Sequence, residues 1–146
     1  MSRPVLFLRI ASVLTFIHAV LHTAGGVFGA IPPGPASVAV LAMKTNVFLA
    51  LGETRTFWEY YRGMGLAVSI FLTAESVAFW FLAALAKRDA VRLRPLLATF
   101  AVAYLMFAVD SYFYFFLAPV VTELLIAACL VASTVTAGSV DSAIRA

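Results

Sequence analysis

Several ionisable side chains of this 146-residue chain stand inside long apolar segments, where water does not solvate them. In a membrane such a group costs on the order of 2 to 3 kcal/mol, so it usually faces a helix bundle and pairs with another group. Imidazoles, guanidinium groups and carboxylates can transfer protons and bind the polar heads of ligands. The groups placed well inside the apolar segments are His22, Arg62, Asp110 and Glu123.

The helical rise predicts that these four groups share one depth. At 1.5 Å per residue, counted from the end of each segment, they lie roughly 5 to 10 Å from the same side of the membrane. We therefore expect one polar layer, with His22, Asp110 and Glu123 as candidate catalytic residues. The residues expected to bind a ligand there are His18, Glu59, Arg62 and Tyr114.

The other residues expected in this layer lie about one helical turn from the four residues named first. Glu59 precedes Arg62 by three residues, so the two share a helical face and are predicted to pair. His18 precedes His22 by one turn, and Tyr114 follows Asp110 by one turn. A second pair, Arg9 with Glu75, is expected near the opposite side of the membrane as a structural ion pair.

The spacing of His18 and His22 is also that of metal-binding helices, in which two imidazoles share one face. A nearby carboxylate would complete a site with two histidines and one carboxylate. The plainer interpretation is that both histidines form hydrogen bonds to neighbouring helices. A bis-histidine haem would need a second subunit, because the only two histidines lie on one helix.

The composition indicates the class of protein that carries these residues. Hydrophobic residues make up 64% of the chain and charged residues 12%, whereas a soluble domain carries about 25% charged residues. Too few polar residues remain to cover a soluble surface, so lipid is the expected solvent. The single Cys129 excludes an internal disulfide, and the scattered basic residues form no nucleic-acid patch.

The pattern of apolar runs predicts an all-α fold, a four-transmembrane-helix bundle in a single membrane domain over residues 1–146. The expected spans are about 5–28, 57–86, 96–117 and 120–137, with a tight break at Ala118 and Pro119. Pro95 suits the first position of the third span. A short interfacial helix, lying at the membrane surface, is expected over 37–51 between the first two spans.

The distribution of basic residues predicts the orientation. One side carries Arg3, Arg9, Lys87, Arg88, Arg92, Arg94 and Arg145, and the other carries Lys44, Arg55 and Arg62. Because Lys and Arg favour the cytoplasmic side, we expect a multi-pass protein of the cell membrane with both termini in the cytoplasm.

Two segments resemble a known family. They are His22-Thr23-Ala24-Gly25-Gly26, and Arg55-Thr56-Phe57-Trp58-Glu59-Tyr60-Tyr61-Arg62-Gly63-Met64-Gly65, which opens the second span. Together with Met43-Lys44 they resemble the DoxX-like small four-helix membrane proteins of bacteria. The resemblance implies a four-helix bundle. It leaves a lipophilic redox partner open, since named members are membrane subunits linked to quinone reduction.

Three functional hypotheses follow. The first is a membrane protein whose polar layer, in the non-cytoplasmic half, binds a small lipophilic molecule of the quinone or isoprenoid kind, with proton-coupled redox or acid/base chemistry. The second is a structural or accessory subunit of a larger membrane complex, in which the polar layer only locks the bundle. The third is a membrane metalloenzyme or isomerase. The expected partners are the lipid bilayer and the small molecule, with a homo-oligomer left open.

Overall fold

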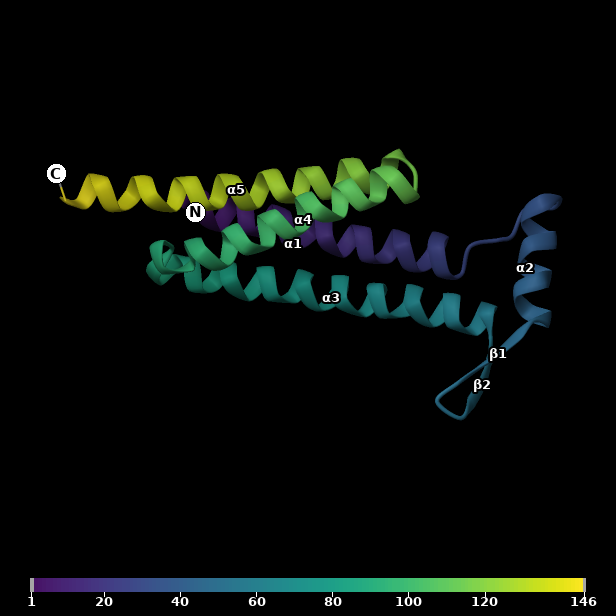
Figure 1. Cartoon of the computed structure of the whole chain (residues 1–146). Coiled ribbons are helices and arrows are strands. Elements are labelled where there is room, and N and C mark those ends of the chain that lie inside the picture. The colour runs from purple at the N-terminus through teal and green to yellow at the C-terminus, as the bar shows by residue number, and fades with distance from the viewer. Residues whose placement is uncertain (1, 146) are drawn as a thin grey trace. The chain divides into compact units, whose positions relative to one another are not determined.

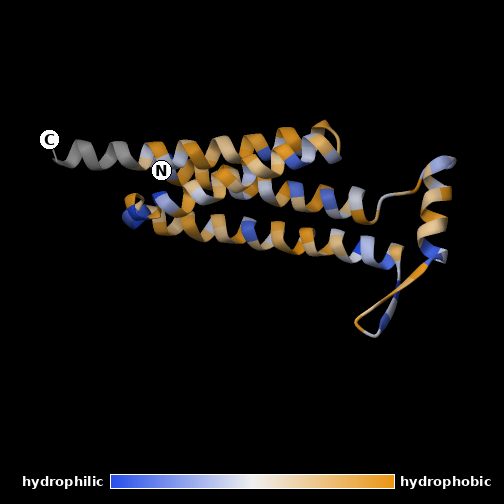
Figure 2. Ribbon diagram, in the orientation of Figure 1, coloured by the Kyte–Doolittle hydropathy of each residue, from blue (hydrophilic) through white to orange (hydrophobic). Residues whose placement is uncertain are grey.

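The structure is a computed structural model that describes the backbone of residues 2–145 and the side chains of residues 2–137. Among these residues, four helical segments are long and apolar enough to cross a membrane: Arg3–Val27, Phe57–Asp89, Val91–Tyr114 and Leu117–Ala137. Figure 1 shows the helices, and Figure 2 shows that most of their residues are hydrophobic. The chain is thus an all-α, multi-pass membrane protein, as the composition predicts.

The spans are built from six helical elements. The first is α1 (Arg3–Leu21), continued by the π-helix η1 (His22–Val27). The second is α3 (Phe57–Asp89). A short 3-10 turn, η2 (Val91–Leu93), precedes α4 (Arg94–Tyr114), and α5 (Leu117–Arg145) follows.

The chain packs as two compact units. The core unit comprises the residues up to His18 and those from Leu72 onward, and the hairpin unit comprises Ala19–Phe71.

Apolar side chains from four helices fill the core unit. Its buried members include Leu8 of α1, Phe79 of α3, Tyr104 of α4, and Ile126 and Leu130 of α5. As predicted, α4 and α5 form an antiparallel pair, but the break between them lies at Phe115 and Phe116 and not at Pro119. Pro119 instead lies in the first turn of α5, where its missing N–H leaves no helical hydrogen bond unmade.

Serine hydroxyls connect the helices of the core unit. Ser12 of α1 donates to the carbonyl oxygen of Ser76 on α3 (2.7 Å), and Ser76 donates back to that of Ser12 (2.9 Å). Ser133 of α5 donates to the carbonyl oxygen of Pro4 (3.2 Å). In membranes such bonds contribute on the order of 0.6 kcal/mol each, and the small side chains let the helices approach closely.

The contact between Pro4 and Ser133 places the start of α1 beside the later part of α5. Figure 1 shows both termini at the same end of the core unit as the connection from α3 to α4. That end carries Arg3, Lys87, Arg88, Arg92 and Arg94. These five residues belong to the set expected on one side of the membrane. The Arg145 side chain lies outside the described residues.

The segment between the first two spans differs from the sequence prediction. A helix, α2, covers Pro35–Thr45, and the chain then forms an antiparallel hairpin of β1 (Val47–Ala50) and β2 (Glu53–Thr56). The predicted helix over 37–51 is therefore too long. The two-residue turn of Leu51 and Gly52 has positive φ at both positions (52° and 86°), the backbone geometry of tight hairpins.

Candidate polar sites of the two units

The first span changes from an α-helix to the π-helix η1 at His22, a residue of the predicted polar layer. The amide of Phe28 donates to the carbonyl oxygen of Thr23 (3.1 Å), five residues earlier, and the Thr23 hydroxyl donates to that of Ala19 (2.7 Å). The adjacent Gly25 and Gly26 lower the cost of this wider turn because glycine is conformationally permissive. Single π-helical turns of this kind occur frequently at functional sites.

His22 opens η1 and contacts the start of α3. Its Nε2 lies 3.1 Å from the carbonyl oxygen of Gly65. A carbonyl oxygen only accepts, so Nε2 carries the hydrogen, and in the neutral ring Nδ1 is left as an acceptor. His22 therefore has a structural hydrogen bond on one side and a ring nitrogen able to accept a proton on the other.

Gly65 fits tightly against η1. A Cβ atom at Gly65 would lie 2.9 Å from Cγ2 of Val27, which is buried, whereas one at Gly63 would meet no described atom within 4 Å. The close approach of the two helices therefore depends on Gly65 and not on Gly63.

We expect Gly65→Ala to destabilise the protein by about 1 to 2 kcal/mol, because the added methyl group overpacks the contact with Val27. The matched control is Gly63→Ala, for which we expect no loss, because alanine favours the helix by about 1 kcal/mol. Denaturant titration of both variants in mild detergent, followed by far-ultraviolet circular dichroism, measures the difference. Equal stabilities would contradict this packing.

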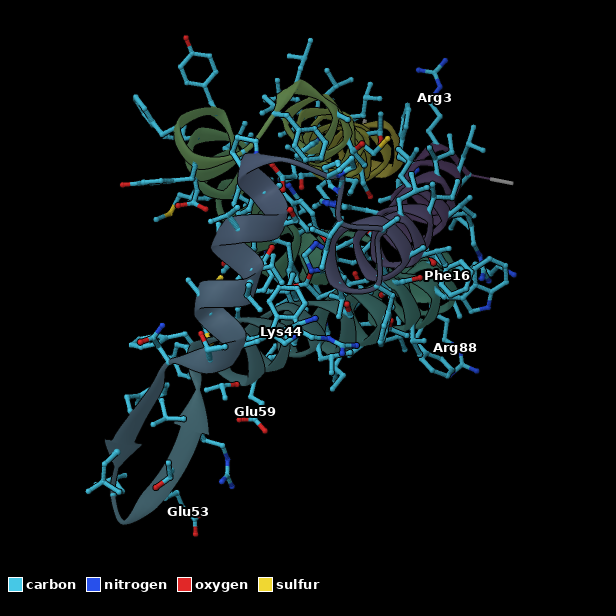
Figure 3. The ribbon with its side chains drawn as sticks, turned by 90° about the vertical axis from the view of Figure 1, so that its right-hand side faces the viewer. Arg3, Phe16, Lys44, Glu53, Glu59 and Arg88 are labelled. Atoms are coloured by element: carbon cyan, nitrogen blue, oxygen red, sulfur yellow. The ribbon has the colours of Figure 1, made fainter. Side chains whose placement is uncertain are left out.

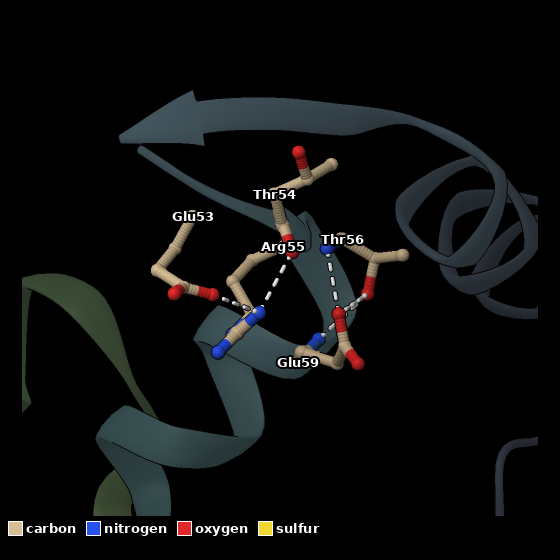
Figure 4. A network of polar contacts seen from close by, with 5 residues as sticks. All are labelled: Glu53, Thr54, Arg55, Thr56 and Glu59. Carbon is tan, nitrogen blue, oxygen red and sulfur yellow. Dashed lines mark hydrogen bonds and ion pairs between the residues drawn. The ribbon is translucent and has the colours of Figure 1, made fainter. Parts of the chain in front are cut away.

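Glu59 caps α3. Its carboxylate accepts hydrogen bonds from the backbone amide (2.7 Å) and the hydroxyl (3.0 Å) of Thr56, and its own amide donates to that hydroxyl (3.1 Å). Figure 4 shows this capping box, and Figure 3 shows Glu59 on the outside of the hairpin unit. The predicted pair of Glu59 with Arg62 is therefore wrong, because the free amides of a helix start compete for the carboxylate.

The capping box predicts a distinctive pair of mutational effects. Thr56→Ala is expected to cost about 1 kcal/mol of stability, and Glu59→Gln is expected to cost almost nothing because glutamine also caps. Glu59→Ala should resemble Thr56→Ala. Thermal unfolding of the three variants tests this, and a Glu59→Gln variant as unstable as Glu59→Ala would point to an ion pair instead.

Arg62 remains without a carboxylate partner. Its guanidinium carbon lies 4.7 Å from the centre of the Phe28 ring, and its buried Nε has no hydrogen-bond partner among the described residues. The ion pairs within the described part of the chain are Glu53 with Arg55, and Asp89 with Arg92. The hairpin unit thus holds a half-buried cation whose charge no carboxylate neutralises.

Comparison of the chain with known proteins adds no relative to this geometry. Neither a protein-family model, nor a curated protein, nor a solved structure matches the chain. The resemblance to DoxX-like proteins thus stays a prediction.

In the core unit, Glu75 and Arg9 have partners other than those predicted. The Tyr104 hydroxyl donates to Glu75 (2.7 Å) and lies 3.4 Å from the hydroxyl of Thr15, while the Arg9 guanidinium lies 3.3 Å from the centre of the Trp80 ring. The predicted pair of Arg9 with Glu75 is therefore wrong. The buried Tyr104 hydroxyl donates a hydrogen bond to the Glu75 carboxylate, and the planar guanidinium of Arg9 stacks on the indole ring of Trp80.

Glu123 of α5 is the buried carboxylate of the core unit. It is 5% exposed, and its Oε1 accepts a hydrogen bond from Ser111 of α4 (3.0 Å). Its Oε2 is buried and has no hydrogen-bond partner among the described residues. The sequence analysis did not predict a role for Ser111. A serine next to Asp110, on the helix expected to pair with that of Glu123, could have indicated a hydrogen bond to this carboxylate.

Asp110 and Tyr114 lie on a different side of α4 from Ser111. Both are exposed, and both line an open groove of about 490 Å³ along α4. Asp110 therefore does not share the buried position of Glu123. His18 is half-buried in α1.

The metal alternative has little support in this geometry. Within either unit, the described residues contain no group of three His, Cys, Asp or Glu side chains placed to hold a metal ion.

Proposed function

We propose that the chain is a membrane protein that binds a small lipophilic molecule with a polar head, of the quinone or isoprenoid kind, at Arg62. The observation that carries this proposal is the buried Nε of Arg62, which has no hydrogen-bond partner among the described residues. An arginine inside a membrane span is expected to serve a ligand or a charge partner.

The surroundings of Arg62 fit a ligand that accepts hydrogen bonds. The guanidinium only donates, so it favours a quinone carbonyl or an isoprenoid phosphate. The Phe28 ring beside it supplies an apolar and aromatic wall. Because α3 is a membrane span, a lipophilic tail bound there extends into the bilayer without leaving its preferred solvent. Proton-transfer roles for His22, Asp110 and Glu123 stay predictions.

A second candidate function is a structural or accessory subunit, and one observation favours it. The core unit satisfies many of its polar groups internally, through the Ser12 and Ser76 pair and the bond from Tyr104 to Glu75. Such bonds lock a bundle and need no ligand.

One experiment separates the two functions. The full chain is purified gently from native membranes, and the sample is analysed by mass spectrometry for both lipophilic small molecules and proteins. A stoichiometric quinone or isoprenoid that is lost in Arg62→Leu supports the ligand site. A stoichiometric partner protein with no small molecule contradicts it and favours the subunit.

A further inference from the structure

The β1–β2 hairpin presents an apolar face that the hairpin unit does not cover. Alternation along β1 places Val47 and Leu49 on one face, where they are 60% and 72% exposed. Phe48 lies on the opposite face and packs against Phe57 (5.0 Å between ring centres) and Tyr60 (5.7 Å). The hairpin is therefore held to the start of α3 by one face and leaves its other apolar face open.

Leu51 extends this face at the turn. It is fully exposed and has a φ of 52°, a conformation that costs a leucine energy and that glycine or asparagine adopts more easily. Neither packing nor backbone geometry within the unit accounts for a large apolar residue there. A contact with an apolar environment outside the hairpin unit would explain it.

The connection to α3 fixes the level of the hairpin in the membrane. β2 ends at Thr56 and α3 begins at Phe57, so no linker separates the hairpin from a membrane span. With 33 residues, α3 is about 50 Å long, whereas the hydrocarbon core is about 30 Å thick. The excess over the hydrocarbon thickness lets the first turn of α3, which precedes Arg62, lie in the headgroup region.

The direction of the hairpin and the nearby side chains agree with that level. Figures 1 and 3 show the hairpin projecting to the side of the beginning of α3 and not continuing beyond it along the helix axis. Trp58 and Tyr61 stack there (5.6 Å), as aromatic residues do at membrane interfaces, and Lys44 lies 5.4 Å from the Trp58 ring. The outer edges of the two strands need water for their backbone groups, which the headgroup region provides and the hydrocarbon does not.

We propose that the hairpin lies in the headgroup region of the leaflet where α3 begins, with Val47, Leu49 and Leu51 in contact with the acyl chains. The occupant of the open face is thus the lipid bilayer itself. The lipid contact offsets the strained backbone of Leu51 and anchors the start of α3. This proposal does not depend on a ligand at Arg62.

Site-specific fluorescence tests the proposal. A Cys129→Ser background carries one new cysteine, either Leu51→Cys or Leu49→Cys, labelled with an environment-sensitive NBD dye after reconstitution of the full chain into phosphatidylcholine and phosphatidylglycerol vesicles. We expect several-fold stronger quenching by lipid-borne nitroxides than by aqueous iodide at both positions. Circular dichroism confirms that each labelled variant keeps its helices.

Two reference positions bracket the result. Phe81→Cys lies on the exposed surface of the second half of α3, within the membrane span, and gives the value for a lipid contact. Arg92→Cys lies in the connection to α4 and gives the value for water. Values at Leu51 and Leu49 near the Phe81 reference support the proposal. Values near the Arg92 reference overturn it.

Discussion

Arg62→Leu is expected to weaken binding of an alkyl benzoquinone by roughly ten- to a hundredfold, because a hydrogen bond from a charged donor contributes about 1.5 to 3 kcal/mol. The measurement is a titration of the protein in nanodiscs, followed by quenching of tryptophan fluorescence. Trp58 lies one turn before Arg62 on α3, so a Trp80→Phe background leaves it as the reporter.

Two controls accompany this titration. Arg62→Lys keeps the charge but loses the planar donor fork, so we expect an intermediate affinity. Arg55→Leu removes an exposed arginine of the same unit that already pairs with Glu53 (3.1 Å), and we expect no change. Equal affinity in Arg62→Leu and the parent protein would contradict the proposed site. Parallel titrations with farnesol and farnesyl diphosphate distinguish a quinone preference from an isoprenoid one.

Tyr104→Ala is expected to destabilise the protein by about 3 kcal/mol, the largest single effect on folding. Tyr104 is 1% exposed and packs near Phe79 and Phe107, with ring centres 6.1 Å apart in both cases. Its removal leaves a cavity at the centre of the core unit and deprives Glu75 of its hydrogen-bond donor. Titration with a denaturing detergent, followed by circular dichroism, measures the loss.

Matched variants separate the cavity from the hydrogen bond. Tyr104→Phe keeps the ring and loses only the hydroxyl, so we expect about 1 to 2 kcal/mol. Tyr112→Ala removes an exposed tyrosine of the same helix, and we expect less than about 0.5 kcal/mol. If Tyr104→Ala were no more harmful than Tyr112→Ala, the packing described for the core unit would be incorrect.

The long elements of the fold could be predicted because their signal is strong and local. Each span is a long and mainly apolar run, and its ends are marked by aromatic, basic or proline residues, as at Phe57 and Lys87. The hairpin could not be predicted in the same way. All four residues of Val47–Ala50 are apolar, so no alternation of apolar and polar residues distinguishes this strand from a helix. Leu51-Gly52 lacks the asparagine or aspartate that usually marks a two-residue turn.

The sequence did not predict which groups the polar side chains contact. Spacing shows that Glu59 and Arg62 share a face, but it does not reveal that backbone amides at a helix start compete for the carboxylate. Likewise, Arg9 and Glu75 are predicted to pair with each other. In the structure, Arg9 lies over the Trp80 ring and Glu75 accepts a hydrogen bond from Tyr104. Partner choice depends on side chains from other helices, which a single sequence does not place.

Photo-crosslinking tests most directly whether a ligand head lies at Arg62. A benzoquinone with a photoreactive group near its ring is bound to the protein in nanodiscs, irradiated, and mapped by peptide mass spectrometry. The structure predicts labelling confined to residues 22–28 and 57–66, competed by unlabelled quinone and lost in Arg62→Leu. Labelling that falls mainly on other helices, or that persists in Arg62→Leu, would contradict the proposed function.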